Sequence, residues 1–93
     1  MIKTFRDSDT RLIFNGGHSK KYSAIEKVAK RKLDMLHFAF SEQDLMVPPA
    51  NRFEHLKGNL AGYCSIRIND QYRIIFEFQD GWAYNVQIID YHR

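Results

Sequence analysis

The spacing of apolar residues changes once along the chain, and this change separates a helical half from a β half. Glu26 stands three residues after Ser23, the spacing of a capping box, in which each side chain satisfies the other residue's free backbone N–H. We therefore expect a helix to begin at Ser23. Its apolar face follows steps of four, four, three and four residues through Ile25, Ala29, Leu33, Leu36 and Phe40.

Shorter elements flank this helix. Residues 2–5 are β-branched and aromatic, which is enough for an edge strand. Asp7-Ser8-Asp9 offers N-cap oxygens to a brief helix that Gly16-Gly17 ends. Pro48-Pro49 prevents the main helix from continuing, and a loop is expected from there to about residue 53.

After Gly62 the apolar period becomes two, which predicts β-strands. Asn69-Asp70 and Asp80-Gly81 have turn chemistry, so three strands follow one another as two hairpins. The alternation assigns these side chains to the core face: Cys64, Ile66, Ile68, Tyr72, Ile74, Phe76, Phe78, Trp82, Tyr84, Val86 and Ile88.

Together these segments predict one α+β domain over residues 1–93, since a chain this short builds a single modest core. Its antiparallel sheet has three strands, or four with the N-terminal one, and two helices from the N-terminal half cover one face. The single cysteine, Cys64, excludes an internal disulfide and an all-cysteine metal site. Its place on the core face predicts a buried structural thiol.

The charge distribution mildly favours an anionic partner, with a net charge of +3. Two interpretations of the basic first half stay open, a solvated helix face and an anion-binding surface. No stretch resembles a signal peptide or a membrane-spanning helix, so we expect a cytoplasmic protein with no membrane partner. Within this half, residues 20–32 contain one acidic residue, Glu26, and six basic residues: Lys20, Lys21, Lys27, Lys30, Arg31 and Lys32.

The same alternation places Arg67, Arg73 and Tyr91 on the sheet face that the helices leave uncovered. Guanidinium groups match phosphate oxygens, and a phenol ring can stack on a base, so this face suits a nucleic acid. The alternative is structural. The two arginines would then be surface residues paired with Glu77, and Tyr91 would be an edge packing residue.

Asp90 and His92 fall on the opposite face if the last strand stays regular, but we expect the strand to end before them. A histidine near an aspartate can gain and lose protons near neutral pH. The alternative for His92 is a disordered terminal residue. Lys57, in a Gly-flanked loop, supplies another cation.

These groups fit RNA cleavage by attack of the 2′-OH on the neighbouring phosphate. That reaction needs a base, an acid and cations for the developing negative charge, and it needs no metal. The four histidines and the carboxylates show no metal-ligand spacing. We therefore expect neither a metal site nor a cofactor.

Four motifs carry a family resemblance that spans nearly the whole chain. They are Pro48-Pro49-Ala50-Asn51-Arg52, Leu56-Lys57-Gly58, the run from Ser65 to Gln71, and Asp90-Tyr91-His92. In order and spacing they resemble the HigB toxins of the RelE superfamily. The resemblance implies a RelE-like fold and a ribosome-dependent mRNA endonuclease that cuts message in the ribosomal A site and so inhibits translation. It also implies a HigA-type helix-turn-helix antitoxin, through which alone the toxin reaches operator DNA.

The resemblance also implies roles for the polar residues. The catalytic site would consist, with Lys57 assisting, of Arg67, Arg73, Asp90, Tyr91 and His92. The hypotheses are that the two arginines stabilise the scissile phosphate, that Asp90 and His92 transfer protons with His92 as the acid, and that Tyr91 stacks on a nucleotide. A basic helix face would contact ribosomal RNA through Lys27, Lys30 and Arg31.

The chain departs from the family pattern at two positions. Many relatives carry His-Pro-Leu-Lys-Gly, with that histidine in the active site, whereas Glu54-His55-Leu56-Lys57-Gly58 has its histidine one position later. His55 is therefore an RNA-binding candidate whose role a shifted loop either keeps or loses. Cys64 stands where an aromatic residue is common, which we interpret as a core substitution.

Two other functions remain open. Gyrase-poisoning toxins of the ParE type belong to the same superfamily but generally lack the terminal Asp-Tyr-His cluster. A non-catalytic RNA-binding domain would keep Arg67 and Arg73 but would have no use for His92.

Overall fold

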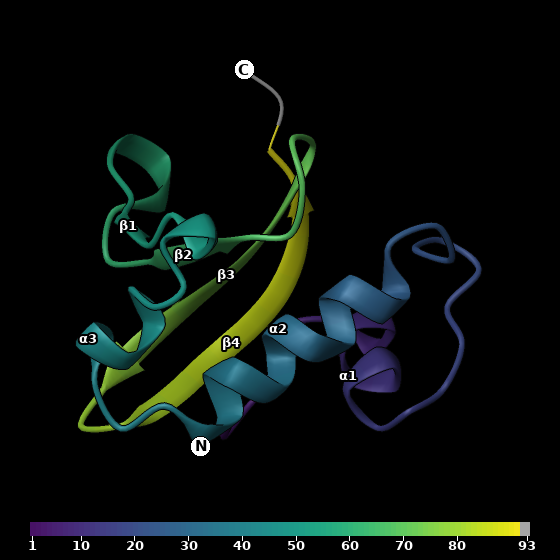
Figure 1. The fold of residues 1–93 in the computed structure, drawn as a ribbon, viewed down its shortest axis with the longest axis horizontal. Coiled ribbons are helices and arrows are strands. Elements are labelled where there is room, and N and C mark those ends of the chain that lie inside the picture. Colours follow the sequence, from purple (N-terminus) through teal and green to yellow (C-terminus); the bar gives the residue numbers. More distant parts are fainter. Residues whose placement is uncertain (92–93) are drawn as a thin grey trace.

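A computed structural model describes residues 1–91 of the chain and has the predicted α+β architecture (Figure 1). No helix among the described residues is long and apolar enough to cross a membrane. The elements, in chain order, are α1 (Ser8–Phe14), α2 (Glu26–Phe38), α3 (Glu42–Leu45), the 3-10 helix η1 (Pro49–Asn51), β1 (Glu54–His55), the 3-10 helix η2 (Gly58–Leu60), β2 (Cys64–Arg67), β3 (Tyr72–Gln79) and β4 (Trp82–Asp90).

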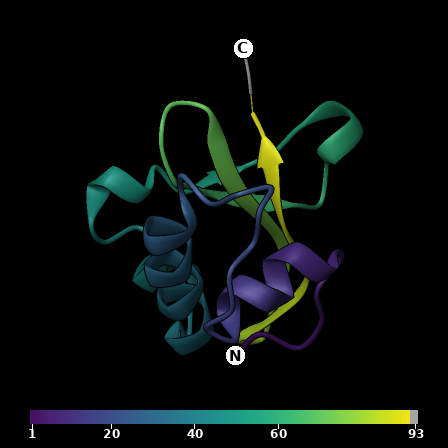
Figure 2. The same ribbon diagram turned by 90° about the vertical axis from the view of Figure 1, so that its right-hand side faces the viewer.

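The four strands form one antiparallel sheet in the order β1-β2-β3-β4. Helices α1 and α2 lie on the same side of this sheet, as Figures 1 and 2 both show. The core lies between the two layers, where Leu33 and Leu36 of α2 are buried with Ile66, Ile74 and Phe76 of the sheet. The prediction of two helices covering one face is therefore confirmed.

The fourth strand is β1, and the prediction of a fourth strand at the N-terminus was wrong. Ile2 and Phe5 instead form isolated parallel bridges with Ala83 and Val86 of β4. A continuous ladder does not form because the N–H of Asn85 donates to the side-chain oxygen of Thr4 at 2.8 Å instead of to a backbone carbonyl. The segment therefore lies along the outer edge of the sheet without extending it.

The predicted limits of α2 were wrong at both ends. The helix begins at Glu26, and its N-cap, Ile25, makes no side-chain cap hydrogen bond. The Glu26 carboxylate accepts a hydrogen bond from the N–H of Ser19 at 3.0 Å, so it does not form a capping box with Ser23. The helix ends at Phe38, which leaves Phe40 89% exposed instead of on the buried face.

The early end of α2 follows from the short helix α3, which the sequence did not predict. Ser41 and Asp44 form a capping box at its start. The Asp44 carboxylate accepts hydrogen bonds from the N–H groups of Phe40 and Ser41, at 2.9 and 3.2 Å. These contacts satisfy a new helix start, so the chain leaves α2 two residues before the apolar period ends.

The predicted alternation holds through β2 and β3 and breaks in β4. Glu77 pairs with Tyr84, but Ile75 pairs with Gln87, so β4 contains one extra residue, and Asn85 has a φ of 54°. A β-bulge of this kind shifts every following side chain to the other face. The predicted inward positions of Trp82 and Tyr84 were therefore wrong: Ala83 is the fully buried residue there, and Trp82 is 40% exposed.

Candidate functional site

The register of the sheet brings three of the predicted site residues together. Arg67 lies directly opposite Arg73, and Arg73 lies directly opposite Ile89 of β4. Residues directly opposite each other share one face of a sheet. Tyr91 follows Ile89 by two positions, and all three polar residues line one cleft of about 350 Å³. The sequence prediction that they share a face is confirmed.

Five of the seven described residues that line the cleft are charged. Its wall contains three guanidinium groups, two carboxylates, an amide and a phenol: Arg52, Arg67, Arg73, Glu54, Asp70, Asn69 and Tyr91. Like charges directly opposite each other destabilise a sheet, so the pair of facing arginines needs carboxylates nearby. The arrangement leaves a net positive surface, which suits a phosphate.

Arg73 is the fixed cation of the cleft, because it is only 6% exposed. Its Nη1 donates to Glu54 Oε1 at 2.8 Å, and its Nη2 donates to the backbone carbonyl of Arg52. The ring of Tyr91 lies 5.4 Å from the Arg73 guanidinium carbon, a cation–π distance. These contacts hold the guanidinium in one orientation before any ligand arrives.

Arg67 is held more loosely. It forms an ion pair with Asp70, whose side chain is fully exposed, while the Arg67 side chain is 30% exposed. Exposed ion pairs of this kind contribute little free energy, so an anion can replace Asp70. The alternative in which Glu77 is the arginines' partner was wrong, because Glu77 accepts a hydrogen bond from Asn85 Nδ2 at 2.7 Å instead.

Four cleft residues were not predicted as site residues: Arg52, Glu54, Asn69 and Asp70. Of these, Arg52 and Glu54 contact Arg73. Arg52 ends η1 in the left-handed conformation, with a φ of 45°, and the chain then turns into β1. Glu54 pairs with Ser65 in the register of β1 and β2, which directs its side chain to the face of Arg73. The only sequence signal for Arg52 was its place in the Pro-Pro-Ala-Asn-Arg motif.

The last residues of β4 differ partly from the expectation. The strand continues through Asp90, so the prediction that it ends earlier was wrong. Asp90 pairs with Tyr72, on the face opposite the cleft, and its carboxylate accepts a hydrogen bond from Gln71 Nε2 at 3.1 Å. Among residues 1–91, which the structure describes, the cleft wall does not include Asp90. His92 lies outside the described residues.

Comparison with known proteins gives the chain a family. A model of the RelE-like HigB toxin of type II toxin–antitoxin systems matches residues 3–92. The chain belongs to this HigB-like toxin family. Toxin HigB-1 of Vibrio cholerae is 55% identical over 87 residues, which are 94% of this chain and 85% of the relative. Endoribonuclease HigB of Proteus vulgaris is 31% identical and aligns with 99% of this chain and all of its own length.

Solved structures of RelE-like toxins share the fold of this HigB-like toxin. A toxin–antitoxin complex of YoeB and YefM from Staphylococcus aureus matches with a TM-score of 0.61 and 22% identity, covering all of this chain and 97% of the other. YafQ from Escherichia coli matches with a TM-score of 0.51 and 18% identity, covering 80% and 89% of the two chains. At these identities the likeness concerns the fold alone.

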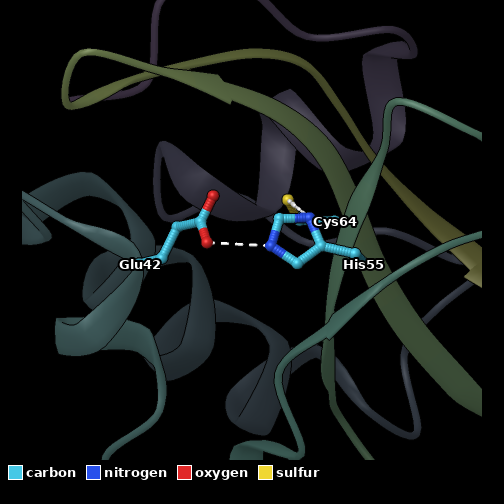
Figure 3. Close-up of side chains that lie close together, drawn as sticks. All are labelled: Glu42, His55 and Cys64. Atoms are coloured by element: carbon cyan, nitrogen blue, oxygen red, sulfur yellow. Dashed lines mark hydrogen bonds and ion pairs between the residues drawn. The ribbon is translucent and has the colours of Figure 1, made fainter.

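His55 and Lys57 of the HigB-like toxin lie outside the cleft. His55 pairs with Cys64 across β1 and β2, so its side chain points to the face opposite Glu54. It contacts Glu42 Oε1 through Nε2 at 2.8 Å and lies 3.5 Å from the Cys64 sulfur (Figure 3). Lys57 is exposed at the start of η2 and is not part of the cleft wall.

The basic face of α2 is smaller than the sequence suggests. Lys27 and Arg31 are exposed. Lys30 instead forms an ion pair with Asp34 at 2.7 Å and lies over the ring of Phe14. Because this ion pair is also exposed and contributes little free energy, Lys27, Lys30 and Arg31 together stay a candidate anion-binding surface on this helix.

Lys32 is buried and has a structural role. Its ammonium group donates to Asn51 Oδ1 at 2.5 Å, and both residues are nearly inaccessible to water. Burial lowers the pKa of Lys32, and the neighbouring charges of Arg31 and Arg67 lower it further. The contact ties η1 to α2 and so fixes the segment that carries Arg52 into the cleft.

Proposed function

We propose that this HigB-like toxin is a metal-independent endoribonuclease that cleaves mRNA on the ribosome and so inhibits translation in the cytoplasm. The observation that carries the proposal is the cleft in which Arg52, Arg67 and Arg73 converge. The relative from Proteus vulgaris is named an endoribonuclease. A surface of this shape and charge suits a single phosphodiester of an RNA strand.

The proposed chemistry is attack of a ribose 2′-OH on the adjacent phosphate. Arg73 supplies fixed positive charge where negative charge develops on the phosphate, because its partners already hold its orientation. Arg67 exchanges Asp70 for a phosphate oxygen. Tyr91, already placed beside Arg73, stacks on the neighbouring base.

Proton transfer needs one acceptor and one donor. Glu54 lines the cleft beside Arg73, so we propose its carboxylate as the acceptor of the 2′-OH proton. His92 stays the proposed donor to the departing 5′-oxygen. Asp90 points to the other face in the described structure, so its proposed contribution is to position the chain end through Gln71.

The ribosome would supply the rest of the RNA surface. Lys27, Lys30 and Arg31 of α2 are proposed to contact ribosomal RNA, with Lys57 as a further cation outside the cleft. Binding through such contacts weakens steeply as salt concentration rises.

Primer extension on a reporter mRNA after brief expression of the toxin tests the proposal. We expect discrete cuts within the translated frame that disappear when translation is blocked. In a purified assay on a pre-formed ribosome complex, which keeps its own Mg²⁺, toxin that has been stripped of metal by a chelator beforehand should give the same cuts. The His92→Ala variant is expected to give no cuts. Growth arrest without cuts would favour a gyrase-poisoning toxin. The absence of both growth arrest and cuts would favour a non-catalytic RNA-binding domain.

Membership of a toxin–antitoxin family implies an antitoxin partner, and we propose a helix-turn-helix protein of the HigA type that alone contacts operator DNA. An exposed apolar surface supports a docking site for it. The aromatic patch, as we name it, surrounds a hollow of about 360 Å³ and comprises Met1, Phe38, Phe40 and Trp82. Phe38 and Phe40 are 74% and 89% exposed, and apolar patches of this kind mark protein interfaces.

Replacing Phe38 and Phe40 by serine is expected to weaken binding of the antitoxin at least about 100-fold, because aromatic anchors at the centre of an interface each contribute 2 kcal/mol or more. RNA cleavage should not change, because the patch lies by the β3–β4 turn, at the opposite end of the sheet from the cleft (Figure 1). Co-purification and calorimetry with the proposed helix-turn-helix antitoxin measure the effect. Unchanged affinity in the double variant would place the antitoxin elsewhere.

A further inference from the structure

Three side chains with metal-binding atoms meet on the face of β1 and β2 that lies away from the cleft (Figure 3). Glu42 comes from α3, His55 from β1 and Cys64 from β2. One oxygen, one ring nitrogen and the sulfur of these residues all lie within 4.8 Å of one another. The three positions are distant in sequence, so no motif spacing could reveal the cluster.

Three independent features of the fold bring these side chains together. His55 and Cys64 are directly opposite in the β1–β2 register, which places both side chains on one face. The capping box of Ser41 and Asp44 fixes the start of α3 and with it Glu42. The ring of Phe53 packs edge-on against that of His55, with centroids 5.3 Å apart, and limits its rotation.

We propose that Glu42, His55 and Cys64 form a binding site for a borderline-soft divalent cation, for which Zn²⁺ is the best match. Thiolate, imidazole and carboxylate are the three ligand types that Zn²⁺ takes in proteins, and sites with three protein ligands keep a fourth position for water. Tetrahedral bonds of about 2.3 Å to sulfur and 2.0–2.1 Å to nitrogen place these two atoms about 3.5 Å apart. The Cys64 sulfur and His55 Nδ1 are 3.5 Å apart.

Binding through Nδ1 requires one movement. Glu42 now contacts Nε2 of His55 at 2.8 Å, so its carboxylate must swing along the ring edge to reach the ion. The Glu42 side chain is 39% exposed, which leaves room for this change of rotamer. The sulfur and the imidazole keep their present places.

Binding also displaces a proton. Burial, together with the nearby Glu42 carboxylate, raises the pKa of the Cys64 thiol to about 11. Even the ordinary thiol pKa of about 8.5 keeps a cysteine protonated at neutral pH. The metal takes the thiolate, so each bound ion releases one proton from Cys64.

The site is separate from the proposed cleavage chemistry. β1 has only two residues, with Glu54 facing the cleft and His55 facing the cluster. A bound ion would join α3 to the edge of the sheet and stabilise the fold, whether or not the cleft cleaves RNA. The proposal therefore stands or falls independently of the proposed function.

Competition with a chromophoric zinc chelator tests the site in the reduced, metal-stripped full chain. We expect one Zn²⁺ per chain in the wild type. His55→Ala, Cys64→Ser and Glu42→Gln should each weaken Zn²⁺ binding at least about 10- to 100-fold. Loss of a residue that merely hydrogen-bonds to a metal ligand already has an effect of this size. His18→Ala is the matched control, because His18 contacts a carboxylate, Glu26, at 3.0 Å and is likewise exposed.

Two further readouts separate this site from adventitious binding. Co²⁺ in the same site should give a thiolate-to-cobalt charge-transfer band that Cys64→Ser removes and His18→Ala keeps. Calorimetry in buffers of different ionisation enthalpy should count about one proton released per ion in the wild type and none in Cys64→Ser. Circular dichroism checks the fold of the Cys64 variant, and His55 and Glu42 are exposed enough for their variants to fold. Binding that none of the three substitutions weakens, or a cobalt complex without the thiolate band, would overturn the proposal.

Discussion

Arg73→Ala is expected to lower the rate of mRNA cleavage by about 100- to 1,000-fold, the loss typical of removing one fixed donor to a developing negative charge. The side chain is 6% exposed and is held by Glu54, by the Arg52 carbonyl and beside the Tyr91 ring. Such a group needs no reorganisation as charge builds up on the phosphate, which is why its loss affects the transition state more than binding. Cut intensity by primer extension, at matched protein levels, measures the effect.

Two matched variants give this result its meaning. Arg73→Lys keeps the charge but loses the planar fork, so it should recover only a small part of the rate. Lys27→Ala removes an exposed helix cation and should cost less than about tenfold, with a reduced dependence on salt. Because Arg73 is buried, thermal melting and antitoxin binding must show that its variants remain folded. Equal losses for Arg73→Ala and Lys27→Ala would mean that the cleft is not the active site.

The cleft was predictable where the sheet is regular. β2 and β3 pair without interruption at Arg67 and Arg73, so simple alternation placed both arginines on the correct face. The same counting failed at Trp82 and Tyr84, because the bulge at Asn85 adds one residue to β4. Alternation carries no information about a bulge. Here the N–H of Asn85 bonds to the side chain of Thr4, which lies 81 residues away in the sequence.

Contacts between segments distant in the chain could not be predicted from the sequence. Glu54 and His55 are adjacent, yet the two-residue strand β1 sends one to Arg73 and the other to Cys64. The family resemblance made His55 an RNA-binding candidate, whereas its strand position directs its side chain to the face opposite the cleft. Only the register with β2 distinguishes the two outcomes, and neither residue's neighbours in sequence set that register.

Counting charges also overstated the basic surface. The charge pattern grouped Lys30 and Lys32 with Lys27 and Arg31, but one is paired with Asp34 and the other is buried against Asn51. A lysine that belongs to the core cannot be recognised from composition, since its acceptor lies 19 residues away. The catalytic roles of the cleft residues stay predictions, and the variants above test them.

Asn51→Ala is expected to destabilise the fold by about 3 kcal/mol, which lowers the Tm of a domain this size by about 12–24 °C. Asn51 is fully buried, accepts a hydrogen bond from the Lys32 ammonium at 2.5 Å and donates to the Leu45 carbonyl at 3.2 Å. Alanine leaves a buried charge and a buried carbonyl without these partners. Urea unfolding measures the loss, and Asn59→Ala, an exposed asparagine in η2, should change stability by less than about 0.5 kcal/mol.

A double-variant cycle with Lys32→Met separates the buried charge from the packing. If the uncompensated ammonium causes most of the loss, Lys32→Met in the Asn51→Ala background should recover about 1–2 kcal/mol, because it removes the charge that has no acceptor. Additive effects of the two substitutions would contradict this explanation and would assign the loss to the cavity.

The alkaline pH dependence gives an independent check on the same contact. The pKa of Lys32 is lowered in the folded chain, so the unfolded chain binds more protons just below the ordinary lysine pKa of about 10.4, and stability contributed by this group rises with pH there. Tyr22 and Cys64, whose pKa values are raised, act in the opposite sense in the same range. The difference in unfolding free energy between wild type and Lys32→Met cancels their contributions. The unfolding free energy of the wild type should rise relative to that of Lys32→Met as pH rises from about 8 to 10. A difference that does not change with pH would mean that Lys32 keeps its ordinary pKa in the folded chain.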